Sequence, residues 1–251
     1  MKSFVFALQL LTRIRILDLS FNEKALGRST MFFPLVGLFL GGILVFIHRV
    51  AGEIFPPAAV AAAVVVALVM LTGGMHLDGF MDTVDGLFSG RPRERMLEIM
   101  KDSRAGSFGV VGVVCLLLFK FSLITGIAGV YDYMGLIMMT VTGRWGMTYA
   151  TARFPYAREE GMGRLFTLHT GIPELAVASL TALVVSAVAG GLGGLIIFLS
   201  AGIFTHLLCM YMNKVLGGLT GDTYGAVNEV LEVFVLALYI SLNRLAPILF
   251  P

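Results

Sequence analysis

The stretch Pro57-Ala-Ala-Val-Ala-Ala-Ala-Val-Val-Val-Ala-Leu-Val-Met-Leu-Thr-Gly73 contains no charged side chain, and it decides the fold class. A helix needs roughly 18–20 apolar residues to cross about 30 Å of hydrocarbon, and this run approaches that length. Similar runs recur along the chain. The sequence therefore predicts an all-α polytopic membrane bundle of about seven transmembrane helices, over residues 31–47, 57–73, 108–127, 134–151, 174–189, 195–212 and 226–242.

Composition supports this class. Hydrophobic residues make up 57% of the 251 residues, the mean hydropathy is +0.90, and only 14% are charged, whereas soluble domains average about 25% charged residues. No separate soluble domain fits between the apolar runs, so we expect a single membrane-embedded domain over residues 1–251. The net charge of +2 is too small and too dispersed to indicate nucleic-acid binding.

The distribution of basic residues predicts the topology. Connections between the apolar runs alternate between rich and poor in Lys and Arg, and with a cytoplasmic N-terminus that side receives fourteen of the 18 basic residues. The positive-inside rule therefore favours a cytoplasmic N-terminus and an odd number of crossings. This topology follows from the basic residues alone. It also places several acidic residues on the cytoplasmic side: Asp78, Asp82, Asp85, Asp102, Glu159, Glu160 and Asp222. We expect the chemistry on that face.

An acidic motif directly follows the first quoted run. In Gly73-Gly-Met-His-Leu-Asp-Gly-Phe-Met-Asp-Thr-Val-Asp-Gly86, the residues Asp78, Asp82 and Asp85 have the spacing of one helix face. Like charges on one stripe repel, so a cation is expected to neutralise them. A hard divalent ion completed by substrate phosphates fits, whereas zinc prefers more nitrogen and sulfur ligands. The alternative is an acidic helix face that is simply solvated.

Two basic segments are candidates for binding a charged substrate. A short amphipathic helix beginning near Pro92 leads to Lys101-Asp-Ser-Arg104, where an arginine fork and a lysine point charge suit phosphate. A juxtamembrane basic anchor is the alternative. The connection from residue 153 to 170 adds Arg153 and Arg158, which suit a charged substrate but are unspecific by themselves.

The last cytoplasmic connection has the pattern Gly217-Gly-Leu-Thr-Gly-Asp-Thr-Tyr-Gly225. Its glycines let the backbone approach a ligand, and Thr220, Asp222 and Thr223 offer oxygen atoms to a metal or a phosphate. It lacks the Gly-Lys-Ser/Thr of a P-loop. Asn228 and Glu229 follow inside a span, where an ionisable group suggests function. The residues alone thus predict a Mg²⁺-type site acting on phosphorylated substrates, without naming the reaction.

Three motifs carry a family resemblance: His76-Leu-Asp-Gly-Phe-Met-Asp-Thr-Val-Asp-Gly-Leu-Phe88, Leu97-Glu-Ile-Met-Lys-Asp-Ser-Arg104 and Thr220-Gly-Asp-Thr-Tyr-Gly225. The chain resembles the cobalamin synthase (adenosylcobinamide-GDP ribazoletransferase) family over almost its whole length. The resemblance implies transfer of α-ribazole or its 5′-phosphate onto adenosylcobinamide-GDP, which gives adenosylcobalamin or its phosphate and GMP. It further implies Mg²⁺ and a location in the cytoplasmic (inner) membrane.

The resemblance also suggests a role for each candidate residue. The expected metal ligands are Asp78, Asp82, Asp85, Asp222 and Glu229; the expected substrate contacts are Lys101, Asp102, Arg104, Arg153, Arg158, Thr220, Thr223 and Asn228. The expected catalytic residues are His76, Asp82 and Asp85, one of which takes the proton of the attacking hydroxyl. Because a corrinoid is large, a wide cytoplasm-facing cavity is also predicted.

Other functions remain open at this point. A CDP-alcohol phosphotransferase or a membrane prenyltransferase also uses spaced aspartates, although their motifs differ from this one. A secondary transporter would show internal repeats and ionisable groups at mid-bilayer; no repeat is evident, and Lys120 and Arg144 are the only central candidates. The sequence also leaves open whether the protein forms a homo-oligomer.

Overall fold

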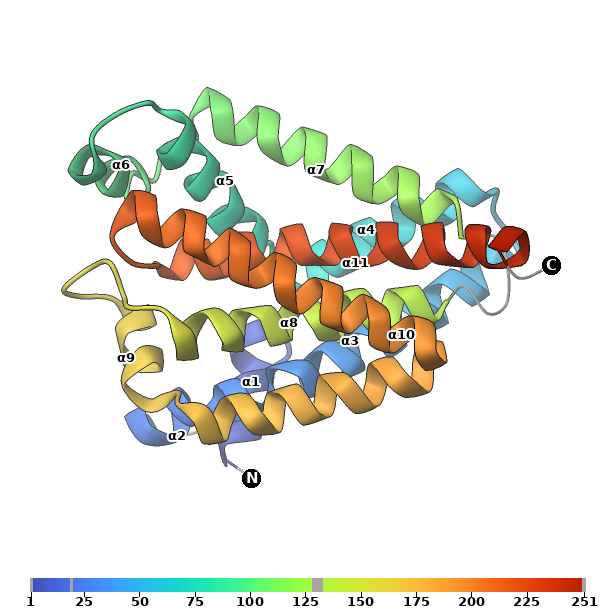
Figure 1. Cartoon of the computed structure of the whole chain (residues 1–251), viewed down its shortest axis with the longest axis horizontal. Helices are drawn as coiled ribbons and strands as arrows, with labels where there is room; N and C mark the ends of the chain where they lie inside the picture. The colour runs from blue at the N-terminus through green and yellow to red at the C-terminus, as the bar shows by residue number, and fades with distance from the viewer. Residues whose placement is uncertain (1, 19, 128–132, 250–251) are drawn as a thin grey trace.

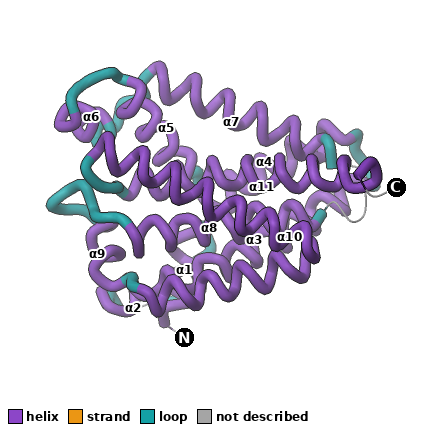
Figure 2. Tube along the Cα trace, viewed as in Figure 1, coloured by secondary structure: helices purple, strands orange, loops and turns teal. Residues whose placement is uncertain are grey.

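The computed structural model describes residues 2–18, 20–127 and 133–249, and within them the chain consists of helices joined by loops, with no strand (Figures 1 and 2). In chain order the helices are α1 (Lys2–Leu11), α2 (Glu23–Gly27), the 3₁₀ helix η1 (Arg28–Phe32), α3 (Phe33–Gly52), α4 (Pro57–Thr72), α5 (Met75–Phe88), α6 (Arg93–Ile99), α7 (Ser107–Thr125), α8 (Met134–Arg153), α9 (Met162–His169), α10 (Ile172–Leu216) and α11 (Gly221–Leu249). The predicted all-α class is confirmed.

The long helices lie along the long axis of the molecule, as Figure 1 shows. The short helices α2, α6 and α9 gather at one end of this bundle, whereas the C-terminus lies at the other. The end that carries the short helices also holds the connection between α10 and α11. Segments far apart in the sequence therefore meet there, including the acidic and basic motifs.

The predicted spans can be compared with the helices one by one. Each of the seven ranges falls on a helix, and the ranges 174–189 and 195–212 both fall on α10. That helix turns sharply at Gly191, which has φ 55° and ψ −135°, and Figure 1 shows it doubling back on itself. By length and apolarity, four helical stretches of the described residues can cross a membrane, or five if the bent pair of α4 and α5 forms one span. The number seven and the cytoplasmic N-terminus stay predictions.

Burial separates the inside of the bundle from a lipid-like outer surface. Helix α8 lies inside, with almost every residue from Gly135 to Ala150 buried. Helices α7 and α10 instead expose large apolar side chains such as Val111, Leu118, Leu180 and Leu199. Such a continuous exposed apolar surface would be a liability in water but is matched by hydrocarbon. The chain is a multi-pass membrane protein.

A sharp bend between α4 and α5 places the acidic motif. The two helices meet at 91°, and the turn consists of Gly73 and Gly74, whose φ angles are 66° and 71°. Residues with a Cβ rarely adopt this left-handed conformation, whereas glycine adopts it without steric cost. Because of this bend, α5 leaves the direction of the bundle and runs toward the end where α6 lies (Figure 1).

Candidate functional site

Helices α5 and α11 cross with their backbones in close approach. A Cβ atom on Gly79 would lie 2.8 Å from the carbonyl oxygen of Asp222, and one on Gly225 would lie 3.0 Å from that of His76. Real side chains would force such helices apart, so this crossing depends on the two glycines. It brings the acidic face of α5 against the first turn of α11.

Three carboxylates meet at this crossing. Asp82 is half-buried. Among the charged groups around it, the exposed Asp78 has the strongest electrostatic effect, followed by Asp222 of α11. The guanidinium of Arg158 approaches Asp222, with Nη2 2.8 Å from Oδ2. Within the described residues no three acidic, histidine or cysteine groups are close enough to hold a metal ion alone. Mg²⁺ commonly takes one or two carboxylates and completes its shell with water and substrate phosphate, and this oxygen donor set fits that pattern.

Two buried threonines hold Asp222 in place. The backbone amide of Thr223 donates to Thr220 Oγ1 at 3.2 Å, and that of Thr220 donates to Thr223 Oγ1 at 2.8 Å. This reciprocal pair caps the N-terminus of α11. The hydroxyl of Thr220 also donates to Asp222 Oδ2 at 3.2 Å. Both threonines were predicted to contact substrate; their contacts in the structure are those of positioning residues.

Arg158 is positioned by a short backbone pairing. The amide of Ala157 donates to the carbonyl of Leu219 at 2.8 Å, and the amide of Leu219 donates to that of Pro155 at 2.8 Å. Arg93 of α6 adds a third link, since its Nε donates to the carbonyl of Leu216 at 2.6 Å. These bonds join α6, the connection after α8 and the connection before α11. The predicted substrate contact Arg158 thereby reaches the acidic motif from a distant part of the sequence.

Asp85 has a different role from the one predicted. Its side chain is only 7% exposed, and its two oxygens accept hydrogen bonds from the amides of Gly106 and Gly109, both at 2.8 Å. These amides belong to the first turn of α7, so Asp85 caps that helix and ties α5 to it. The spacing suggested that Asp85 joins Asp78 and Asp82, but its carboxylate is already engaged by backbone donors.

Glu229 is also occupied elsewhere, in a buried ion cluster. Lys120 Nζ lies 2.7 Å from Glu229 Oε2 and 2.6 Å from Glu232 Oε2, and Arg144 pairs with the other oxygen of Glu232. All four side chains are at most 6% exposed. Two positive and two negative groups balance one another, so Glu229 neutralises a lysine here and does not reach the three aspartates.

Asn228 and His76 extend this cluster toward the site. Asn228 Nδ2 lies 3.4 Å from carboxylate oxygens of both Glu229 and Glu232 and 3.3 Å from His76 Nδ1. The two carboxylates require the amide nitrogen, a donor, on that side. His76 Nδ1 is therefore the acceptor, and in the neutral ring Nε2 carries the proton. This tautomer makes His76 a donor, which disfavours its predicted role as proton acceptor. Asn228 is fully buried, and its contacts in the structure are with His76 and the two glutamates.

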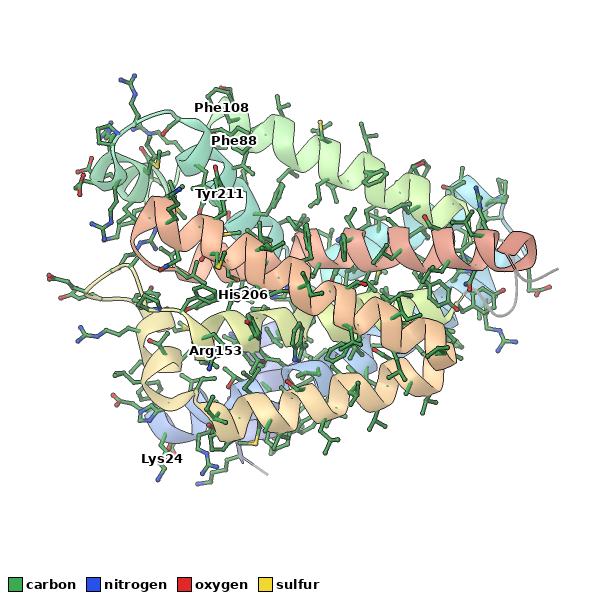
Figure 3. The ribbon with its side chains drawn as sticks, viewed as in Figure 1. Lys24, Phe88, Phe108, Arg153, His206 and Tyr211 are labelled. Carbon is green, nitrogen blue, oxygen red and sulfur yellow. The ribbon has the colours of Figure 1, made fainter. Side chains whose placement is uncertain are left out.

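The remaining basic candidates lie at the same end of the bundle. Lys101 and Arg158 both line an open groove of about 470 Å³ between α6 and residues 157–160. Arg104 is exposed and bonded to Asp102, with Nη2 2.6 Å from Oδ2. Hydrogen bonds from Arg104 lower the pKa of Asp102 to about 2, so this exposed pair stays charged. Arg153 is exposed at the end of α8 (Figure 3).

Two further spaces border the carboxylates, and the wide cytoplasm-facing cavity stays a prediction. Besides the groove at Lys101, a cavity of about 220 Å³ is bordered by Asp78 and Asp222. Another open groove, of about 480 Å³, is lined by Arg13, Gly73 and Asp78. Asp78 therefore borders both spaces, an arrangement that suits two different ligands meeting at one carboxylate.

Comparison with known proteins agrees with the motifs of the site. A family model described as cobalamin-5-phosphate synthase matches residues 3–240. The chain belongs to this family. The predicted resemblance is therefore confirmed, and so, at the level of the family, is a function in the final nucleotide-loop assembly stage of cobalamin biosynthesis. No solved structure matches the chain.

Several curated proteins resemble this cobalamin synthase family member over most of their length. An adenosylcobinamide-GDP ribazoletransferase of Roseiflexus sp. (strain RS-1) is 43% identical over 86% of this chain and 80% of its own length. Those of Acetivibrio thermocellus and Alkaliphilus metalliredigens are 35% and 39% identical, over 95% and 92% of this chain and 97% and 92% of their own. These names support a transferase.

The most informative residue that sequence reasoning missed in this synthase is Glu232. It lies three residues after Glu229 on the same face of α11 and contacts both Lys120 and Arg144. The available signal was charge balance: two basic residues inside predicted spans require buried acidic partners, and the Glu-x-x-Glu spacing offers two of them.

The cap at α7 leads to a testable prediction for this synthase. Replacing Asp85 by Asn removes one of two carboxylate oxygens that accept amide protons, so we expect the free energy of unfolding to fall by about 1–2 kcal/mol. Under the Mg²⁺ dependence that we propose below, the Mg²⁺ concentration at half-maximal turnover should stay that of the wild type. Denaturant titration in detergent and a Mg²⁺ titration of activity measure the two quantities, with Asp18→Asn as an exposed control. A markedly raised Mg²⁺ requirement would contradict the assignment of Asp85 as a cap.

Proposed function

We propose that the chain joins α-ribazole or its 5′-phosphate to adenosylcobinamide-GDP, releasing GMP and forming adenosylcobalamin or its phosphate. The observation that carries the proposal is the meeting of Asp78, Asp82 and Asp222 where α5 crosses α11. Such clustered oxygen donors suit a divalent cation shared with a pyrophosphate. The names of the relatives supply the reaction that this chemistry serves.

The transfer is a displacement at phosphorus. A hydroxyl oxygen of ribazole forms a bond to the phosphorus attached to cobinamide, the bond from that phosphorus to the bridging oxygen breaks, and GMP leaves with the bridging electrons. The hydroxyl proton passes to a carboxylate of the site, since the tautomer of His76 makes this ring a donor. Reactions of this kind depend chiefly on positioning and charge neutralisation.

Mg²⁺ belongs to this proposal. One or two of the carboxylates of Asp78, Asp82 and Asp222 would hold it together with substrate phosphate oxygens, and when bound it would neutralise charge on the pyrophosphate. Arg158 already lies beside Asp222, and Lys101 lines the same groove as Arg158. Both side chains can move onto phosphate oxygens, because they reach the groove from connections outside the bundle.

We also propose that the protein lies in the cytoplasmic membrane with this site facing the cytoplasm. Fourteen of the 18 basic residues fall on the side assigned to the cytoplasm. In the structure, the short helices α2, α6 and α9 lie at the same end of the bundle as the site (Figure 1). A basic surface there matches the anionic inner leaflet.

The first experiment uses purified protein in liposomes with adenosylcobinamide-GDP, α-ribazole phosphate and Mg²⁺. GMP and the corrinoid product are followed by chromatography, with and without EDTA. We expect both products in equal amounts, loss of turnover with EDTA, and recovery when Mg²⁺ is restored. Turnover that is indifferent to EDTA would remove Mg²⁺ from the proposal. Uptake of a substrate into the liposomes without chemical change would instead favour a transporter.

A further inference from the structure

The smaller cavity beside the aspartates has a composition unlike that of the two open grooves. It measures about 220 Å³, and its walls include Phe33, His76, Asp78, Phe166, Asp222 and Tyr224. Phe33 and Phe166 pack edge to face with ring centroids 6.3 Å apart, and both are buried. The cavity is therefore lined mainly by apolar and aromatic side chains, with the carboxylates of Asp78 and Asp222 among them.

Two residues that line this cavity have a buried polar atom without a hydrogen-bond partner among the described residues: His76, at Nε2, and Tyr224, at its hydroxyl. His76 is 1% exposed, and its Nε2 has no hydrogen-bond partner in the part of the chain that the structure describes. Because Nδ1 accepts from Asn228, Nε2 carries the proton of the neutral ring. A buried donor without a partner costs free energy, so a ligand that offers an acceptor at this position is favoured.

The size of the cavity limits what it can hold. Pockets that enclose a whole drug-sized ligand span about 300–1,000 Å³, so this cavity is too small for a corrinoid or a complete nucleotide. It is large enough for one flat fused-ring base. The base of ribazole is a substituted benzimidazole, which has two apolar fused rings and one free ring nitrogen that accepts a hydrogen bond.

We propose that this cavity is the subsite for the base of ribazole, with His76 as the residue that recognises its free ring nitrogen; the inference rests on the proposed function. The aromatic rings of Phe33 and Phe166 contact the base, as base-binding proteins commonly arrange. With the base held here, the ribose extends toward Asp78 and Asp222. The reacting hydroxyl then lies beside the carboxylates, and the open groove at Arg13 stays free for the larger substrate.

The first test removes one aromatic wall. Phe166→Ala is expected to weaken binding of free α-ribazole about tenfold, because it deletes a stacking surface. Equilibrium dialysis of α-ribazole against the protein in nanodiscs measures the affinity, and the KM for α-ribazole phosphate gives a second readout. The KM for adenosylcobinamide-GDP should change by less than about twofold. Phe46→Ala is the matched control, since Phe46 is an exposed phenylalanine of α3.

The second test addresses the hydrogen bond. An analogue in which a carbon replaces the free ring nitrogen, an indole riboside, is expected to bind the wild type about tenfold more weakly than α-ribazole. His76→Phe keeps a ring of similar shape but removes the donor, so this variant should no longer distinguish the two nucleosides. The affinities for α-ribazole and for the indole riboside are measured on the same sample of each protein. Their ratio therefore does not depend on the fraction of the protein that is folded.

The outcomes separate this inference from the proposed function. Wild-type protein that binds α-ribazole while Phe166→Ala and His76→Phe leave both the affinity and the discrimination unchanged would overturn the subsite and leave the transferase intact. If the wild type neither binds α-ribazole nor transfers it, the proposed function itself fails. A weaker ribazole affinity together with an equally raised KM for the corrinoid would show general damage to the site and would also overturn the subsite.

Discussion

Asp82→Asn is expected to lower turnover at least about a hundredfold in protein that is still folded. The change replaces a carboxylate by a neutral amide at the centre of the three aspartates, where Asp82 interacts with Asp78 and Asp222. A lost ligand weakens the hold on a metal, and lost charge stabilisation in a closed site commonly costs 10²–10³ in kcat. A Mg²⁺ titration of GMP release measures the effect. We expect a higher Mg²⁺ requirement as well as a lower maximum.

The control for Asp82→Asn is Asp18→Asn, the same chemical change at an exposed position. It should leave both the turnover and the Mg²⁺ requirement unchanged. Thermal unfolding of the variants in detergent separates a folding defect from a catalytic one. Asp82→Asn protein with wild-type unfolding, wild-type turnover and an unchanged Mg²⁺ requirement would remove Asp82 from the metal site and leave only Asp78 and Asp222.

Lys120→Met is expected to have the largest effect on stability, about 3–5 kcal/mol of unfolding free energy. The lysine ammonium contacts Glu229 and Glu232 inside the bundle. Its removal leaves two buried carboxylates with a single guanidinium, that of Arg144, and an uncompensated buried charge is costly. Denaturant unfolding in detergent micelles, together with the yield of membrane-inserted protein, measures the loss. Lys214→Met, at an exposed lysine, is the control.

The double variant Lys120→Met, Glu229→Gln tests the cause. It removes one charge of each sign, so that Glu232 and Arg144 remain as a balanced pair, and we expect it to recover a good part of the lost stability. If the double variant is as unstable as the two single losses added together, the lysine acts through its packing and not through charge. The balanced cluster also bears on function, because Lys120 and Arg144 were the only central candidates for a transporter, and both are paired.

Some site residues could be predicted from spacing alone. Asp78 and Asp82, one helical turn apart, share a face of α5 as the i, i+4 pattern indicates, and the first turn of α11 brings Asp222 to them. Asp85 also matches the pattern, but a helix face is broad enough for its last member to contact a different neighbour. That neighbour is the start of α7, whose unbonded amides attract a carboxylate. A pattern on one helix cannot tell which partner each position meets.

The sequence by itself determined the all-α membrane class and the segments that become helices. Hydrocarbon requires every backbone polar group to be bonded within its own helix, so an apolar run of sufficient length has one outcome. Only the tertiary structure decided which charged groups meet: Arg158 with Asp222, Lys120 with Glu229 and Glu232, and Asp85 with the first turn of α7. These pairs join positions 21 to 112 residues apart, and helix crossings at glycines such as Gly79 and Gly225 set their distances. A crossing depends on the packing of two surfaces at once, and no single stretch of sequence contains both.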